Sequence, residues 1–332
     1  MSQQTPVTFT NRKGLQLFGI LHTPSDHSSG GLGVVLLSPG VKMRVGPQCL
    51  YRRMTEEFLR LGLSVLRFDF HGLGDSEGTL PESQLRDVYN HIQVGRFVDD
   101  TIDAMDWMQA QLGVRRFILS GLCGGAITGL LAGERDKRVV GLLGIGITAV
   151  LAARDADASR YMTIGQLEES RGIYFRRLFN PGAWLRLLTF KADYRLIWRL
   201  IEHSLRRRLH PPAAVPAAAP PPEDDDANPL FPPAFFNMLA SERPMLLVFG
   251  GSDRLQWEFD EKFVNRHRER LARLPQVHQV HIVPHANHVL SLSEWQRDML
   301  DVSARWLRRY FPDDVMPALV EAGSLAPRSQ AS

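Results

Sequence analysis

The stretch Phe117-Ile118-Leu119-Ser120-Gly121-Leu122-Cys123-Gly124-Gly125-Ala126 decides how this chain folds. A run of strand-forming residues, 116–120, leads into the stretch, and a run rich in Ala, Leu and Gly, 126–134, follows it. Between them lies Gly-x-Cys-x-Gly, which has the spacing of the G-x-S-x-G nucleophile elbow with Cys in place of Ser. The pattern predicts a strand, a sharp turn and a helix, with Cys123 on the turn.

The predicted turn needs small residues on both sides of Cys123. A nucleophile on a strained turn stands clear of its sheet only where strand and helix pass close together, so the positions two before and two after it cannot carry bulk. Gly121 and Gly125 meet that need. The sulfur would lie at a helix N-terminus, where free N–H groups and the helix dipole favour a thiolate. The alternative is a buried structural cysteine in a glycine-rich turn.

Outward from this stretch, strand and helix patterns alternate along the chain. This alternation predicts an α/β fold with a mostly parallel, doubly wound sheet. The long apolar run 139–153 is too short to span a bilayer and is typical of a central strand buried on both faces. The other expected strands are 7–10, 15–22, 34–37, 64–70, 245–250 and 277–283, and the other expected helices are 48–61, 96–112, 258–274 and 292–310.

A long interruption divides the alternating pattern into two parts. Residues 154–209 are helical in pattern, rich in Arg and aromatic residues, and are expected to form an inserted helical cap. Residues 210–233 are rich in Pro and Ala, as flexible linkers are. The expected organisation is a core of residues 1–153 and 234–312, interrupted by cap and linker and followed by a flexible tail, 313–332.

Composition excludes several function classes. A net charge of +3 gives weak grounds for nucleic-acid binding, so no nucleic-acid partner is expected. Two cysteines do not make a disulfide framework, the first six residues lack the apolar segment of a secretory signal, and no transmembrane segment is expected, which together favour the cytoplasm. The chain shows no metal-ligand spacing, phosphate-binding loop or dinucleotide motif, so neither a metal nor a cofactor is predicted.

A cysteine nucleophile needs a base, and the base needs an acid that orients it. Enzymes with this elbow present nucleophile, acid and base in that chain order, the later two after late strands. Asp253, in Gly250-Gly251-Ser252-Asp253, is the predicted acid, with a turn or helix cap as its alternative role. His288, in Pro284-His285-Ala286-Asn287-His288, is the predicted base, and His285 is its competitor.

An oxyanion hole needs two N–H groups aimed at the developing negative charge. The residue after the nucleophile, Gly124, supplies one, and Val41, in the loop after strand 34–37, is the simplest source of the other. Asp69, His71, Asp75 and Ser76 are interpreted as a structural corner, and Cys49 as a helix residue near the oxyanion loop. The cationic character of 154–210 is typical of a solvated helical face; the alternative is that it attracts an anionic substrate, such as a coenzyme A thioester, or an acidic membrane surface.

With these motifs assembled, the sequence resembles the α/β-hydrolase superfamily, and within it the hydrolases associated with bacterial exosortase systems. The resemblance implies a Cys123–Asp253–His288 triad in a bacterial cytoplasmic protein. The Cys-Gly-Gly of the elbow departs from that group and is closer to dienelactone hydrolases and polyester synthases. The matching stretches are 40–46, 65–69, 72–76, Gly121-Leu122-Cys123, Arg177-Leu178 with Trp184, Gly251-Ser252-Asp253 with Glu258-Phe259, and Ala286-Asn287-His288 with Ser291.

The predicted function is hydrolysis of an ester or thioester through a Cys-His-Asp triad and an acyl-enzyme. The expected partner is a small acyl substrate. If the cationic surface attracts the substrate, the substrate is anionic. Two rival functions remain open: an acyltransferase that uses the same acyl-enzyme, and a binding scaffold without catalysis. The sequence sets no oligomeric state.

Overall fold

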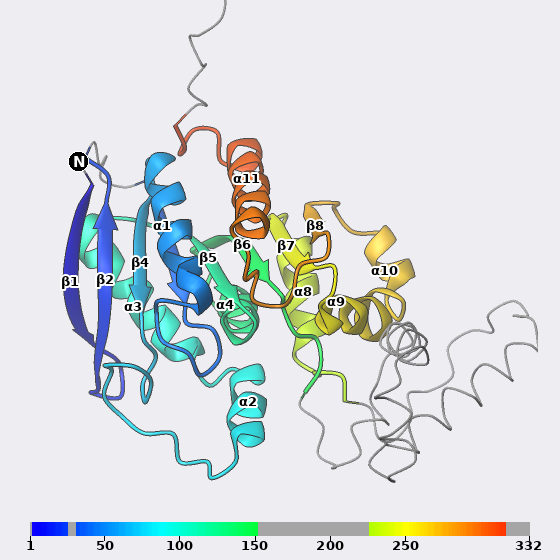
Figure 1. Cartoon of the computed structure of the whole chain (residues 1–332), viewed down its shortest axis with the longest axis horizontal. Coiled ribbons are helices and arrows are strands. Elements are labelled where there is room, and N and C mark those ends of the chain that lie inside the picture. Colours follow the sequence, from blue (N-terminus) through cyan, green and yellow to red (C-terminus); the bar gives the residue numbers. More distant parts are fainter. Residues whose placement is uncertain (1, 26–30, 152–225, 317–332) are drawn as a thin grey trace, which may run out of the picture.

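The computed structural model describes residues 2–25, 31–151 and 226–316, and its centre is an eight-stranded sheet (Figure 1). The strand order is β1-β2-β4-β3-β5-β6-β7-β8. The first two neighbour pairs are antiparallel, and every pair from β4 to β8 is parallel. The strands are β1 (Gln3–Thr10), β2 (Gln16–Thr23), β3 (Leu32–Leu37), β4 (Ser64–Phe68), β5 (Arg116–Leu122), β6 (Val139–Ile145), β7 (Met245–Gly250) and β8 (His278–Val283). The predicted mostly parallel, doubly wound sheet is confirmed.

Helices cover both faces of the sheet because the central strands are apolar on both sides. Every residue of β3 and β7 is buried, which an α/β sheet allows only between two helical layers. One layer holds α1 (Leu50–Arg60) and α11 (Ser293–Tyr310), which meet across a core that includes Tyr51 and Trp306. The other holds α3 (Val98–Leu112), α4 (Gly124–Arg135), α8 (Phe231–Ala240) and α9 (Arg254–Phe259).

The helix α2 (Leu85–Gln93) lies beyond the carboxyl ends of the parallel strands, below the sheet in Figure 1. The sequence analysis did not predict it. Its apolar residues Leu85, Val88, Tyr89 and Ile92 follow the i, i+3, i+4, i+7 spacing of an amphipathic helix, so the signal was present.

Several predicted boundaries were wrong for identifiable physical reasons. The strand expected over 139–153 ends at Ile145, because Gly146 turns the chain with φ 51°. The helix expected over 258–274 is divided into α9, a π-helical segment η3 (Asp260–Val264) and α10 (Arg268–Ala272). The expected start of α1 at 48 is a short 3₁₀ segment, η1 (Pro47–Cys49), in which Gln48 and Cys49 have positive φ.

Two described segments lie inside regions expected to be linker or tail. Helix α8 begins at Phe231, inside the linker expected over 210–233, and proline is tolerated in its first turn. Within the tail expected from 313, Asp314 pairs with Arg116, and the Met316 N–H donates to the Leu61 carbonyl. The predicted cap, 154–209, and most of the predicted linker and tail lie outside the described residues.

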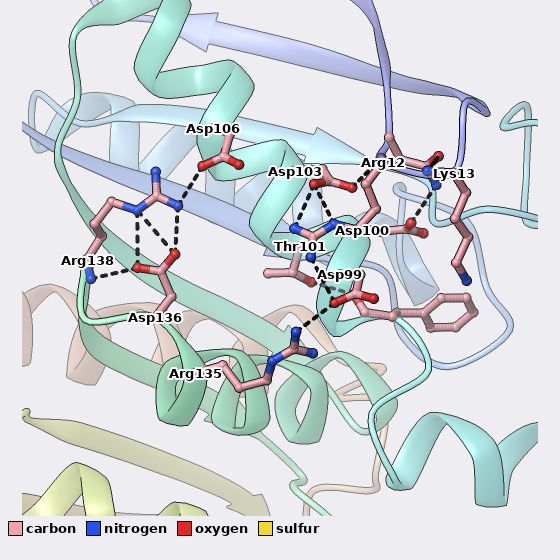
Figure 2. A network of polar contacts seen from close by, with 12 residues as sticks. Arg12, Lys13, Asp99, Asp100, Thr101, Asp103, Asp106, Arg135, Asp136 and Arg138 are labelled. Carbon is pink, nitrogen blue, oxygen red and sulfur yellow. Dashed lines mark hydrogen bonds and ion pairs between the residues drawn. The ribbon is translucent and has the colours of Figure 1, made fainter.

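An ion-pair network on the outer face of α3 ties three segments together (Figure 2). Arg12, from the β1–β2 turn, points to Asp99 and Asp103. Arg138, just before β6, reaches Asp106 on α3 and Asp136 beside it. Exposed pairs of this kind contribute about 1 kcal/mol or less each, so the network orients the hairpin more than it stabilises the fold.

Candidate active site

Cys123 lies on the turn between β5 and α4, as the motif predicts. Its backbone has φ 54° and ψ −112°, a strained combination for a residue with a side chain. The Cys123 N–H donates to the Ile145 carbonyl at 2.8 Å, so the chain is held by β6 up to the turn itself. The sulfur therefore lies at the carboxyl edge of the sheet and at the N-terminus of the 12-residue helix α4.

The glycines around Cys123 are required by close backbone contacts. A Cβ on Gly121 would lie 2.6 Å from the carbonyl carbon of Gly125, and a Cβ on Gly125 would lie 2.3 Å from the Leu37 carbonyl oxygen. Both distances are below any real Cβ contact. The helix can thus pass over the strand only because these positions are bare, which is the reason given by the sequence motif.

Asp253 and His288 meet at the same edge of the sheet. Asp253 follows β7, His288 follows β8, and the His288 Nδ1 lies 2.7 Å from the Asp253 Oδ2. The other carboxylate oxygen, Oδ1, accepts the Leu255 N–H at 3.2 Å and caps α9. The carboxylate thus contacts the imidazole and caps the helix at once, so the helix cap does not exclude the predicted role as acid.

The imidazole of His288 also lies near the Cys123 side chain. Burial lowers the pKa of His288, but Asp253 and Cys123 raise it to about 10. The Asp253 side chain is only 4% exposed, which strengthens its pull on the ring. The structure therefore places Cys123, His288 and Asp253 near one another at one edge of the sheet.

Gly146 packs closely against the imidazole of His288 and the Asp253 carboxylate. The sequence analysis did not predict this role for Gly146. A Cβ at this position would lie 2.8 Å from His288 Cε1, 2.9 Å from Nδ1 and 3.3 Å from Asp253 Oδ2. The positive φ of Gly146 is part of the same turn, which ends β6 beneath the imidazole. Any side chain here would displace the ring from the carboxylate.

The loop after β3 contacts the first residue of α4. A Cβ on Gly124 would lie 2.8 Å from the Gly40 Cα and 3.0 Å from the Gly40 nitrogen. The Lys42 N–H is engaged in a turn with the Pro39 carbonyl at 3.0 Å, which removes it as an oxyanion donor. Val41, one residue earlier, stays the predicted second donor beside Gly124.

Buried Asp69 holds the far end of this loop. Its Oδ1 accepts the Arg44 N–H at 2.6 Å, and its Oδ2 pairs with the Arg44 guanidinium, which also reaches Asp75. Ser76 closes the corner by donating to the Asp69 carbonyl at 2.6 Å. In the same corner the His71 Nδ1 lies 2.7 Å from Asp100. These contacts fit a structural corner that fixes the loop.

Two side chains of α2 border the elbow, and sequence reasoning missed both. Ile92 lies 3.0 Å from the position a Gly124 Cβ would take, and the Tyr89 ring lies 2.9 Å from the position of a Gly40 Cβ. Burial and the nearby charge of Cys123 raise the pKa of Tyr89. By contrast, exposed His285, with φ 60°, lies on the surface turn, and Cys49 is exposed at the start of α1.

Within the described ranges, no three His, Cys, Asp or Glu side chains gather as metal ligands do. Among the described helices, none combines the length and apolar character needed to cross a bilayer.

Solved structures share this fold at low sequence identity. Esterase Pf2001 of Pyrococcus furiosus aligns with a TM-score of 0.56 at 16% identity, covering 92% of this chain and 90% of that one. A putative alpha/beta hydrolase of Agrobacterium tumefaciens, ATU1826, aligns with 0.52 at 16%, covering 94% and 100%. The protein PA2218 of Pseudomonas aeruginosa aligns with 0.53 at 19%, covering 93% and 94%. No protein with a curated description matches the sequence.

The fold seen here is the alpha/beta hydrolase fold, with the elbow turn after β5 and the predicted acid and base after β7 and β8. Residues 34–302 match the model of the Alpha/beta hydrolase family, which is more than half of the chain. The chain belongs to the alpha/beta hydrolase family and is a hydrolase.

Proposed function

We propose that this hydrolase cleaves a carboxylic ester or thioester through Cys123, His288 and Asp253. The observation that carries the proposal is the imidazole of His288, which lies 2.7 Å from the Asp253 carboxylate while its pKa is raised by Asp253 and by the neighbouring Cys123. A nucleophile, a base and an orienting acid in this order are the recurring parts of covalent acyl-transfer catalysis.

In the first half-reaction, the Cys123 sulfur attacks the acyl carbon and the carbonyl oxygen becomes negatively charged. The N–H groups of Gly124 and Val41 stabilise that charge. The carbon–oxygen or carbon–sulfur bond of the leaving group then breaks, and the leaving group takes a proton from the imidazolium of His288. The product that remains is a thioester between the acyl group and Cys123.

In the second half-reaction His288 must act as a base, so its pKa must fall after the first half-reaction. In the free enzyme, burial lowers the pKa of His288, while Asp253 and the charged sulfur raise it to about 10. Acylation removes the charge on the sulfur, so the imidazole releases its proton more readily. Neutral His288 can then take a proton from water, which attacks the thioester and frees the acid.

The finer features of this function stay predictions. One solved structure of this fold, XC6422 of Xanthomonas campestris, is described as a serine hydrolase, whereas the elbow here carries Cys123. The name of the structurally similar esterase Pf2001 is the one argument from a solved structure for an ester substrate. Membership of the exosortase-associated group, a cytoplasmic location and an anionic substrate rest on the sequence, and the cationic segment behind the last of these lies outside the described residues.

A panel of p-nitrophenyl esters and acyl-coenzyme A thioesters tests the proposal. We expect turnover on at least one class, and an acyl adduct on the tryptic peptide that contains Cys123 when the reaction is quenched in acid. Addition of an alcohol or thiol acceptor separates the two enzymatic readings: free acid means hydrolysis, and a new ester means acyl transfer. Absence of both turnover and adduct across the panel would favour the binding scaffold.

The imidazole of His288 should stay protonated far above the ordinary range of a histidine. Burial lowers the pKa of His288, but Asp253 and the neighbouring Cys123 raise it to about 10. In an NMR titration we therefore expect the ring signals of His288 to change near pH 10, whereas an unperturbed histidine titrates near pH 6.5. A midpoint near pH 6.5 would contradict the pairing.

A further inference from the structure

The buried phenol of Tyr51 bridges the two chain segments that meet at the candidate oxyanion hole. Its hydroxyl donates to the Leu37 carbonyl at 2.6 Å and accepts the Leu122 N–H at 2.8 Å. Leu37 is the last residue of β3, and Leu122 is the last residue of β5, directly before Cys123. One oxygen atom thus contacts the ends of both strands.

The strand register gives this bridge a specific meaning. Strands β3 and β5 pair in parallel, and their last partners are Leu37 and Gly121. In a parallel ladder the next rung would join the Leu37 carbonyl directly to the Leu122 N–H. The phenol oxygen lies between these two groups and gives both of them a hydrogen-bond partner.

This bridge lies where the two segments of the candidate oxyanion hole begin to diverge along the chain. Beyond Leu37 the chain enters the loop that carries Val41, and beyond Leu122 it enters the elbow that carries Gly124. We propose that Tyr51 is a positioning residue whose hydroxyl acts as a spacer and sets the distance between the two oxyanion donors. The inference rests on the proposed acyl-enzyme function and deepens it.

The surroundings of the ring support a fixed spacer. The Tyr51 N–H donates to the Val45 carbonyl at 3.3 Å, and a Cβ on Gly46 would lie 3.0 Å from the ring. The same residue therefore contacts both ends of the loop, through Leu37 and through Val45. Burial, together with the charge of Cys123, raises the pKa of Tyr51 despite the hydrogen bond from Leu122, so the hydroxyl stays protonated and able to donate.

The test is Tyr51→Phe, which keeps the ring and removes only the spacer. Deleting one oxyanion donor costs about 100- to 1,000-fold in kcat, and misplacing it should cost about 10- to 100-fold. We expect this loss in kcat on the best ester of the panel, with KM changed less than about threefold. Alkylation of Cys123 by iodoacetamide needs no oxyanion hole, so its rate should stay within about threefold of the wild type.

The matched control is Thr55→Val on the same helix. The Thr55 hydroxyl is buried and donates to the Tyr51 carbonyl at 2.7 Å, so this variant loses a comparable hydrogen bond without touching the strand ends. Its melting temperature should fall and its kcat should not. If Thr55→Val loses kcat as Tyr51→Phe does, or if Tyr51→Phe keeps full kcat or loses alkylation in parallel, the spacer is refuted.

A second variant covers the case in which the Phe protein does not fold. With 4-aminophenylalanine at position 51, the amine can again join the two backbone groups, and kcat should recover at least part of the loss; a folded protein without ester turnover would overturn the inference. Failure of the proposed function looks different, because the wild type itself would then give neither turnover nor an acyl adduct on Cys123.

Discussion

Replacement of Cys123 by Ala is expected to lower kcat on the best ester of the panel by about 10⁴-fold or more, as removal of a nucleophile does in other triads. The variant has no sulfur to form the acyl-enzyme, so the quenched reaction should also show no adduct. Because Ala fits where Cys fits, the strained turn and its glycines are unchanged, and the melting temperature should stay close to that of the wild type. Stopped assays measure kcat, intact-mass spectrometry of the quenched reaction detects the adduct, and a thermal melt gives the melting temperature.

Cys123→Ser distinguishes the nucleophile from its surroundings. Serine keeps the size and the hydrogen bond to His288, but its hydroxyl does not form the anion that the imidazolium pairs with in the free enzyme. We expect the Ser variant to be far slower than the wild type and faster than Ala. Cys49→Ser is the control: that cysteine is exposed at the start of α1, and its loss should leave kcat unchanged. Full activity in Cys123→Ala would remove the covalent mechanism.

The parts of the site that sequence reasoning reached are those with fixed local spacing. The motif predicts glycines around Cys123, and the structure shows the close backbone contacts that require them: Gly121 against Gly125 nearby in the chain, and Gly125 against Leu37 of β3. Asp253 and His288 were found by a different route, since both follow strands, and the carboxyl ends of parallel strands meet at one edge. This argument predicts that the two side chains lie close together, and the His288 Nδ1 and Asp253 Oδ2 atoms are 2.7 Å apart.

The parts that sequence reasoning missed depend on contacts between distant segments. Gly146 lies in an apolar run that is typical of a strand. No residue in that run predicts that the imidazole of His288, 142 residues later in the chain, packs against Gly146. Tyr51 has the pattern of an ordinary core residue in α1; only the register of β3 and β5 shows that its hydroxyl bridges their ends. Helix α2 is a different case. Its apolar residues have helical spacing, but the residues before it are typical of a loop, and the helix was therefore not predicted.

Replacement of His288 by Ala should be nearly as damaging as loss of the sulfur. The variant lacks the group that gives a proton to the leaving group and takes one from water, so kcat should fall by about 10³-fold or more. Steady-state kinetics on the best ester of the panel measure this loss.

The matched control for this variant is His285→Ala, three residues earlier in the same loop. His285 is exposed on a turn with positive φ, whereas His288 is held by Asp253 and lies over Gly146. Its replacement should change kcat less than about twofold, in line with the effect of a surface substitution. If His285→Ala instead removes activity while His288→Ala keeps it, the base is assigned to the wrong histidine, and the pairing of His288 with Asp253 is then structural, as that of His71 with Asp100 is in the corner beside the loop.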